Sequence, residues 1–160
     1  MKKNMEKTNV MRILDQKKIS YKSHCYADTG AINGADVADV LNQNPAQVFK
    51  TLVTAGSRDS IYVFLVPVLK ELDLKKAAKT VGEKNIRMIK SKDLLTLTGY
   101  IHGGCSPIGM KKTFPTVIDA SAADCDAIFF SAGKIGYQVE IPFGELKKAL
   151  NYKLDDISTD

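Results

Sequence analysis

The chain has 160 residues and a formal net charge of +5, with 44% hydrophobic and 26% charged residues. These values are ordinary for one globular domain and exclude a disordered chain. No stretch of 18 or more apolar residues occurs, so a membrane-spanning helix is not expected. The first ten residues, MKKNMEKTNV, lack the apolar region of a signal peptide. We therefore expect a single cytoplasmic domain, residues 1–160, that does not act at a membrane.

The cysteines argue against disulfides and against zinc. Cys25, Cys105 and Cys125 form an odd set without a CxxC pair, which indicates reduced thiols. His102 and Cys105 have the spacing of half a zinc site, but no second half exists, because the other histidine, His24, stands alone. We therefore expect neither a metal nor another cofactor.

Hydrophobic periodicity and turn residues predict an irregular succession of helices and short strands. In chain order these are a helix over Thr8–Lys18, a strand over Ile19–Tyr26, a helix over Ala35–Leu41, strands over Val48–Thr54 and Ile61–Val66, a helix over Leu72–Val81, a strand over Ile86–Ile89, a helix over Ser91–Leu97, strands over Thr116–Asp119, Ala127–Phe130 and Tyr137–Ile141, and a helix over Phe143–Leu150. Because strands and helices do not alternate strictly, the pattern predicts a mixed α/β domain with a curled sheet.

Several of these helices have recognisable end signals. Thr8 and Ser91 are candidate N-caps, and Gly82 is a candidate C-cap. In the helix that ends at Gly82, we expect one apolar face to point inward. That face consists of Leu72, Leu74, Ala77, Ala78 and Val81.

The most distinctive segment is GYIHGGCSPIG, residues 99–109, which contains four of the eleven glycines. Gly103 and Gly104 allow positive φ and close approach of another group, and the Ser106-Pro107 pair favours an extended or turn conformation. Such a loop offers backbone N–H groups to an anion or to a carbonyl oxygen. The loop is therefore a candidate wall of a binding site, the alternative being a surface turn.

Lys50 is the second candidate, because it interrupts the apolar strand VFKTLV. In a strand, Val48, Lys50 and Leu52 share one face, while Phe49 and Thr51 belong to the other. Lys50 then lies either at a sheet edge, where a lysine prevents edge pairing, or in a cavity. In a cavity its ammonium group would stabilise an oxyanion or a phosphate.

Residues 70–92 hold eight basic residues against three acidic ones, so this segment alone has the charge excess of the whole chain. Lys111 and Lys112 add a small cluster beside the glycine loop. The segment has no aromatic residues, so contact with phosphates is a better interpretation than stacking on bases. The alternative is an ordinary solvated face.

No Ser-His-Asp triad can be assembled from the sequence. A Cys–His hydrolase that uses Cys105 with His102 as its base is one alternative.

Taken together and in order, the motifs VFKTLV, LDLKK (72–76), GYIHGGCSPIG followed by MKK, PTVIDASA and FSAGKIG resemble the YbaK/EbsC family of aminoacyl-tRNA deacylases. Within that family the chain is most similar to the YbaK-type Cys-tRNA(Pro) deacylases, and the resemblance runs from about residue 8 to residue 150. The family is related to the editing domain of bacterial prolyl-tRNA synthetases. The resemblance implies a compact mixed α/β domain with a barrel-like sheet flanked by helices.

The resemblance also implies roles for particular residues. Lys50 matches the family's essential strand lysine, Gly103 matches a glycine that shapes the aminoacyl pocket, and we expect both to be catalytic. The implied substrate-binding set is Tyr26, Thr51, Gly104, Ser106, Pro107, Ser131 and Gln138. Gln138 departs from the family, which has an aspartate there, and Ile135 replaces an arginine. These departures concern the aminoacyl specificity more than the reaction.

In the YbaK type, the thiol of the cysteinyl group attacks its own ester and leaves as a thiolactone, so the protein needs only to position the ester and stabilise charge. The expected function is therefore trans-editing of Cys-tRNA(Pro), bound at its acceptor end, with prolyl-tRNA synthetase as a partner in a ternary complex. The alternatives are a deacylase that uses water attack and a different specificity, or a non-catalytic module that binds tRNA or a synthetase.

Overall fold

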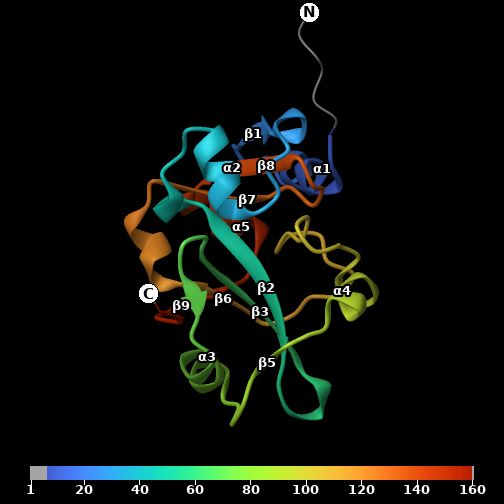
Figure 1. Cartoon of the computed structure of the whole chain (residues 1–160), viewed down its shortest axis with the longest axis vertical. Helices are drawn as coiled ribbons and strands as arrows, with labels where there is room; N and C mark the ends of the chain where they lie inside the picture. The colour runs from blue at the N-terminus through green and yellow to red at the C-terminus, as the bar shows by residue number, and fades with distance from the viewer. Residues whose placement is uncertain (1–6, 160) are drawn as a thin grey trace, which may run out of the picture.

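The computed structural model describes residues 7–159 as short strands and helices in irregular order (Figure 1). The helices are α1 (Asn9–Gln16), α2 (Gly34–Val40), α3 (Leu74–Val81), α4 (Ser91–Thr98) and α5 (Phe143–Ala149), with 3-10 turns η1 (Ala27–Thr29), η2 (Pro45–Gln47), η3 (Ser57–Asp59) and η4 (Ala120–Asp124). The strands are β1 (Lys22–Cys25), β2 (Phe49–Ala55), β3 (Ile61–Pro67), β4 (Glu71–Leu72), β5 (Arg87–Met88), β6 (Thr116–Asp119), β7 (Ala127–Ser131), β8 (Tyr137–Pro142), β9 (Lys153–Asp155) and β10 (Ser158–Thr159). Each helix among these residues is too short or too polar to cross a bilayer.

The strands form three sheets, with the orders β5-β2-β3-β6-β9, β1-β8-β7 and β10-β4. The five-stranded sheet is mixed, because β2 and β3 are an antiparallel hairpin whereas β6 runs parallel to both β3 and β9. The expected mixed α/β class is therefore confirmed. The barrel-like curl is not, because the two larger sheets stay separate and a single β-bridge, between Val48 and Phe129, joins them in the described residues.

The five-stranded sheet is buried on both faces, which explains why β3 is apolar without alternation. Val63 and Leu65 of β3 belong to the larger core, which also contains α1, α5 and the inner residues of β7 and β8. Phe64 and Val66 point the other way, into a smaller core that α3 covers with Ala77. Figure 1 shows α3 on the opposite side of this sheet from the three-stranded sheet at the top.

Two of the expected helix ends are confirmed and one is wrong. The Thr8 hydroxyl oxygen accepts a hydrogen bond from the Met11 N–H at 3.3 Å, and Gly82 ends α3 with a φ of +76°. Ser91, in contrast, is the first residue of α4, and Lys90 occupies the N-cap position without a side-chain hydrogen bond. The N-cap therefore lies one residue before the serine that was expected to occupy it.

The helix expected from Leu72 begins two residues later, and its inward face is smaller than expected. The Asp73 carboxylate accepts hydrogen bonds from the N–H groups of Lys75 and Lys76, both at 3.0 Å, which caps the helix at Asp73. Leu72 consequently lies in β4, opposite Ser158, and Leu74 is 42% exposed. A competing cap therefore overrides the apolar pattern.

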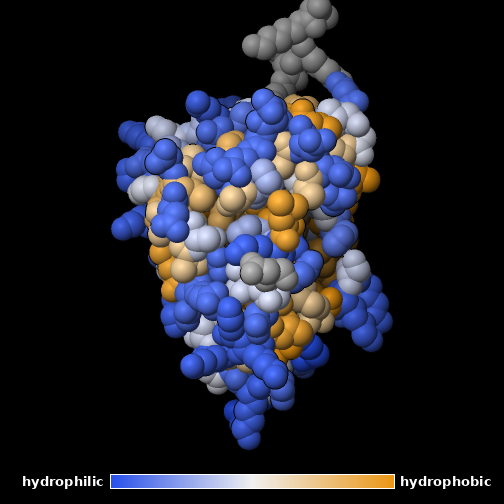
Figure 2. Space-filling view, turned by 60° about the vertical axis from the view of Figure 1, so that its left-hand side comes forward, coloured by the Kyte–Doolittle hydropathy of each residue, from blue (hydrophilic) through white to orange (hydrophobic). Residues whose placement is uncertain are grey.

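On the face shown in Figure 2, hydrophobic residues gather in small groups between hydrophilic ones. The larger exposed apolar side chains include Ile32, Ile101 and Ile135.

Candidate active site

A cavity of about 480 Å³ lies beside β2. α2 with the turn before it forms one wall, and the glycine loop with the segment that leads into α4 forms another. Ser131 of β7 and Gln138 of β8 line it from the three-stranded sheet. The cavity therefore lies at the junction of the two larger sheets.

Six of the nine residues singled out from the sequence line this cavity: Tyr26, Lys50, Thr51, Gly103, Ser131 and Gln138. Gly104, Ser106 and Pro107 do not line it, and all three are buried within the loop. The Ser106 hydroxyl oxygen accepts a hydrogen bond from the Ile108 N–H at 3.3 Å, so this serine supports the loop's own conformation.

Lys50 lies both at a sheet edge and in the cavity. In β2 it pairs with Val66 of β3, whereas β5 reaches only Thr54 and Ala55 on the other side. The Lys50 side chain is 28% exposed, and its Nζ lies 3.6 Å from Oε2 of Glu71. Because Glu71 is 77% exposed, this ion pair is weak and leaves Lys50 open to a ligand anion.

Thr51 brings an unsatisfied hydroxyl to the same place. Among the buried side-chain polar atoms of residues 7–159, Oγ1 of Thr51 alone has no hydrogen-bond partner. A buried unpaired hydroxyl costs about 1–3 kcal/mol. At a cavity wall, a ligand atom or an ordered water can supply the missing partner.

Gly103 needs to be glycine because of its backbone. Its φ is +87°, a conformation that other residues rarely adopt. A Cβ at this position would meet Ile32 and Ile135 only at ordinary contact distances of 3.5 and 3.6 Å. The positive φ, rather than crowding, therefore imposes glycine where the loop faces the cavity.

Gln138 and Ser131 are cross-strand partners on β8 and β7. Gln138 is only 3% exposed, and its side chain exchanges two hydrogen bonds with Gln43, at 2.7 and 3.0 Å. Gln43 belongs to the segment after α2, so the pair ties the α2 wall to β8. Tyr26 is 4% exposed, and burial raises the pKa of its phenol, so the hydroxyl keeps its proton.

Cys105 and His102 also line the cavity, but the thiol is not an activated nucleophile. Burial raises the pKa of Cys105 to about 12, and a thiol with that pKa is almost entirely protonated at neutral pH. His102 is exposed. Within the described chain, no three His, Cys, Asp or Glu side chains come together in a way that could hold a metal ion.

The α2 wall of the cavity was not predicted from the sequence. It consists of Ile32, Gly34 and Val37, together with Val68 after β3. Gly34, directly before the helix expected over Ala35–Leu41, is the residue that could have indicated this wall. A Cβ on Gly34 would lie 2.2 Å from Cγ1 of Val68, so only glycine allows α2 to approach this close.

A family model described as "Aminoacyl-tRNA editing domain" matches residues 31–149, which contain both walls of the cavity. The chain belongs to this family. The editing domain here is 43% identical to a protein of Enterococcus faecalis named as a Cys-tRNA(Pro)/Cys-tRNA(Cys) deacylase, EbsC, over 99% of this chain and 97% of that protein. It is also 25% identical to a proline–tRNA ligase of Burkholderia multivorans, over 78% of this chain and 23% of the ligase.

Solved structures show the same fold for this editing domain. A hypothetical protein, APE2540, superposes with a TM-score of 0.85 at 19% identity, over 94% of this chain and 99% of that one. A structure described as a trans-editing enzyme for prolyl-tRNA synthetase gives a TM-score of 0.80 at 22% identity, over 96% and 99%.

Proposed function

We propose that this protein is a trans-editing deacylase that cleaves the ester of mischarged tRNA, with Cys-tRNA(Pro) as its substrate. The observation that carries the proposal is that Lys50, the unpaired Thr51 hydroxyl and the Gly103 backbone line one cavity. The cysteine that also lines this cavity is not an activated nucleophile. The name that EbsC carries supports the choice of cysteine and of tRNA(Pro). The whole chain, 1–160, then acts as one domain.

The chemistry that suits such a cavity uses the nucleophile of the substrate. The cysteinyl sulfur attacks the carbonyl carbon of its own ester, so that a C–S bond forms and the C–O bond to the terminal ribose breaks. The thiol proton ends on the ribose oxygen, and the amino acid leaves as a thiolactone. The protein contributes orientation, and Lys50 with the loop N–H groups stabilises the negative charge on the carbonyl oxygen.

We assign the tRNA acceptor end as the part that enters the cavity, with prolyl-tRNA synthetase as the partner that supplies tRNA selectivity. The match to a stretch covering 23% of a proline–tRNA ligase supports a connection between this kind of domain and that enzyme. Charged tRNA is used in the cytoplasm, which is where we place the protein.

The decisive experiment follows the ester directly. Purified protein is incubated with Cys-tRNA(Pro) and Pro-tRNA(Pro), and the remaining aminoacyl ester is measured over time. We expect rapid loss of the cysteinyl ester only. Lys50→Ala should abolish the loss while the circular dichroism spectrum stays that of the folded protein, and Cys105→Ser should leave the rate within about twofold.

Other outcomes identify the alternatives. A mobility shift of tRNA without loss of either ester would indicate a binding module. Loss of the prolyl as well as the cysteinyl ester would indicate water attack, because proline has no thiol. Inactivation by Cys105→Ser would indicate a Cys–His hydrolase.

A further inference from the structure

Within residues 7–159, those that line the cavity carry positive charge and no negative charge. Among the described residues that line it, Lys50 is a cation and none is Asp or Glu. Three carboxylates beside lining residues have polar partners and are not themselves part of the lining. Asp36 of α2 accepts a hydrogen bond from Nδ2 of Asn33 at 2.8 Å. Glu71 is the exposed partner of Lys50, and Glu140, two residues beyond Gln138 on β8, is held by Nε2 of His24 at 2.8 Å. His102 at the cavity mouth adds no negative charge.

The inner polar wall is a pair of carboxamides. Gln138 lines the cavity, and its Oε1 accepts from Nε2 of Gln43 at 2.7 Å while its own Nε2 donates to Oε1 of Gln43 at 3.0 Å. A carboxamide does not ionise near neutral pH. The hydroxyls of Thr51 and Ser131, which also line the cavity, are uncharged as well. The wall therefore stays neutral over the working range of pH.

An aminoacyl ester brings an α-amino group, and an α-amino group titrates near pH 7.7–8.0. If protonated, it would enter a partly buried site that contains the Lys50 ammonium and has no carboxylate among its described lining residues. Glu71 lies outside the lining, is 77% exposed and already pairs with Lys50. Burial and a like charge both disfavour the charged form of an amine. The site therefore selects the uncharged amine.

We propose that the cavity binds the aminoacyl group with its α-nitrogen uncharged, and that N-acylated aminoacyl-tRNA esters are consequently substrates as well. This inference rests on the proposed deacylase function. A volume of about 480 Å³ falls within the range of pockets that bury small molecules of drug size, and a cysteinyl group with an added acetyl group is smaller than such a molecule. The bond that breaks is the same ester C–O bond in both substrates.

The test compares two substrates with the wild-type protein, Cys-tRNA(Pro) and N-acetyl-Cys-tRNA(Pro), at pH 8.0 and pH 6.5. We expect similar rates, within about threefold, at pH 8.0. At pH 6.5 the ratio of the N-acetyl rate to the free-amine rate should rise about tenfold, because most of the free amine is then protonated. Taking the ratio removes the effects of pH on the protein that both substrates share. The thiol is not shared, because acetylation removes the positive charge beside it. The same ratio for the loss of each ester without protein is therefore measured and divided out.

Cleavage of Cys-tRNA(Pro) without cleavage of the N-acetyl ester would overturn the inference and leave the proposed function standing. A ratio that does not change with pH would also overturn it. If neither ester is cleaved, the proposed function itself fails.

A variant locates the effect at the carboxamide wall. Gln138→Glu places a carboxylate of the same shape in the cavity, and it should lower the N-acetyl to free-amine ratio at pH 6.5 at least fivefold, whatever its effect on the overall rate. Gln16→Glu makes the same change on the exposed end of α1 and should leave the ratio unchanged. An unchanged ratio in folded Gln138→Glu would exclude this wall as the neighbour of the α-nitrogen.

Discussion

Lys50 lies where a sheet edge and a cavity coincide, so the two interpretations of a lysine in an apolar strand are both correct for it. Because β5 pairs with β2 only at Thr54 and Ala55, the stretch of β2 that contains Lys50 has a neighbour on one side. The lysine thus keeps this edge from pairing and also directs an ammonium group to the cavity. The sequence pattern indicated Lys50, but only the register of β2 decides where it points.

Thr51 is a position where function and stability oppose each other. Its Oγ1 is buried without a partner, so Thr51→Val should raise the free energy of unfolding by about 1 kcal/mol. If that hydroxyl binds the ester, the same change should lower the deacylation rate about tenfold, and Thr51→Ser should retain activity. Denaturant unfolding and the deacylation assay measure the two effects.

Thr54 offers a matched control on the same strand. Its hydroxyl donates to the Tyr62 carbonyl at 2.9 Å, and the residue does not line the cavity. Thr54→Val should therefore destabilise the protein by about 1 kcal/mol and leave the rate per folded molecule unchanged. A stabilising Thr54→Val or a destabilising Thr51→Val would contradict this assignment of the two hydroxyls.

At the scale of elements, most helices and strands were predictable because each depends on local periodicity and caps. The strand expected over Thr116–Asp119 is β6 without change, and the strands expected over Val48–Thr54 and Ile61–Val66 correspond to β2 and β3. The short strands β4, β9 and β10 were missed, because two or three residues have no periodicity to detect. They exist through pairing with distant strands, as Ser158 does with Leu72.

The site was predictable where a residue was unusual for its own segment, as Lys50 and Gly103 are. The Gln43–Gln138 pair was not, because its members are 95 residues apart and each is unremarkable locally. The division into three sheets was not predictable for the same reason: strand order depends on contacts between distant segments.

The close approach of α2 to Val68, the residue after β3, leads to a prediction about stability and substrate binding. In Gly34→Ala the new Cβ would lie 2.2 Å from Cγ1 of Val68, so α2 must move outward. We expect a loss of about 1–3 kcal/mol of stability and a higher KM for deacylation, since both residues line the cavity. Thermal unfolding and steady-state kinetics at a temperature where the variant is folded measure these effects.

Gly144 in α5 is the matched control, because a Cβ there meets nothing within 4 Å. Gly144→Ala should stabilise the helix by about 0.5–1 kcal/mol without a change in KM. Adding Val68→Ala to Gly34→Ala removes the 2.2 Å contact with Cγ1 and leaves the 2.9 Å contact with Cβ, so it should recover part of the lost stability. A double variant no more stable than the single one would show that the Gly34–Val68 contact is not the cause.

At the scale of the whole molecule, the basic segment 70–92 is divided by the fold. Part of it serves internal contacts, since Lys76 bonds to Asp156 at 3.0 Å and Arg87 to Asp59 at 3.3 Å. Lys90 and Lys92 are different, because they flank Ser91, which lines the cavity, and both are exposed. Backbone phosphates of a tRNA acceptor end whose terminal ester entered the cavity would therefore pass close to these two lysines.

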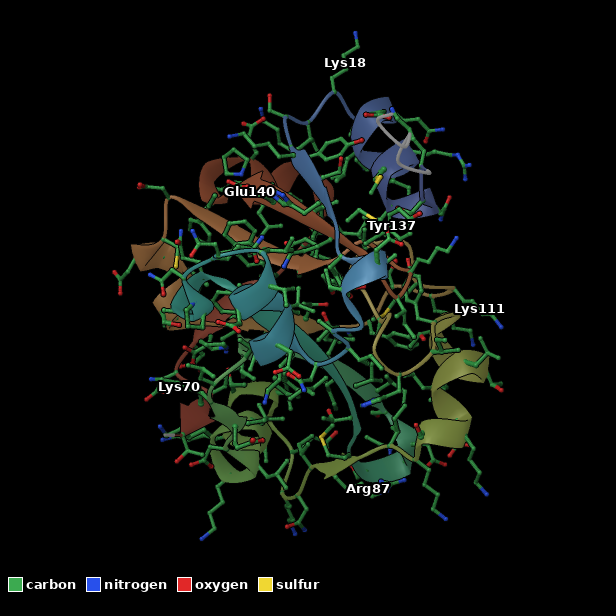
Figure 3. All side chains as sticks on the ribbon, turned by 45° about the horizontal axis from the view of Figure 1, so that its top comes forward. Lys18, Lys70, Arg87, Lys111, Tyr137 and Glu140 are labelled. Atoms are coloured by element: carbon green, nitrogen blue, oxygen red, sulfur yellow. The ribbon has the colours of Figure 1, made fainter. Side chains whose placement is uncertain are left out.

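The double change Lys90→Gln with Lys92→Gln should raise KM for Cys-tRNA(Pro) severalfold and leave kcat unchanged, because the phosphates lie outside the reacting centre. Two lost contacts to single-stranded phosphates also lower the slope of log KM against log salt by roughly 1.4. The control, Lys17→Gln with Lys18→Gln, removes the same charge at the end of α1, far from Arg87 of β5 (Figure 3). An equal rise of KM in both double variants would mean that net charge alone attracts the tRNA, whereas a rise confined to Lys90 and Lys92 assigns its path to the cavity mouth.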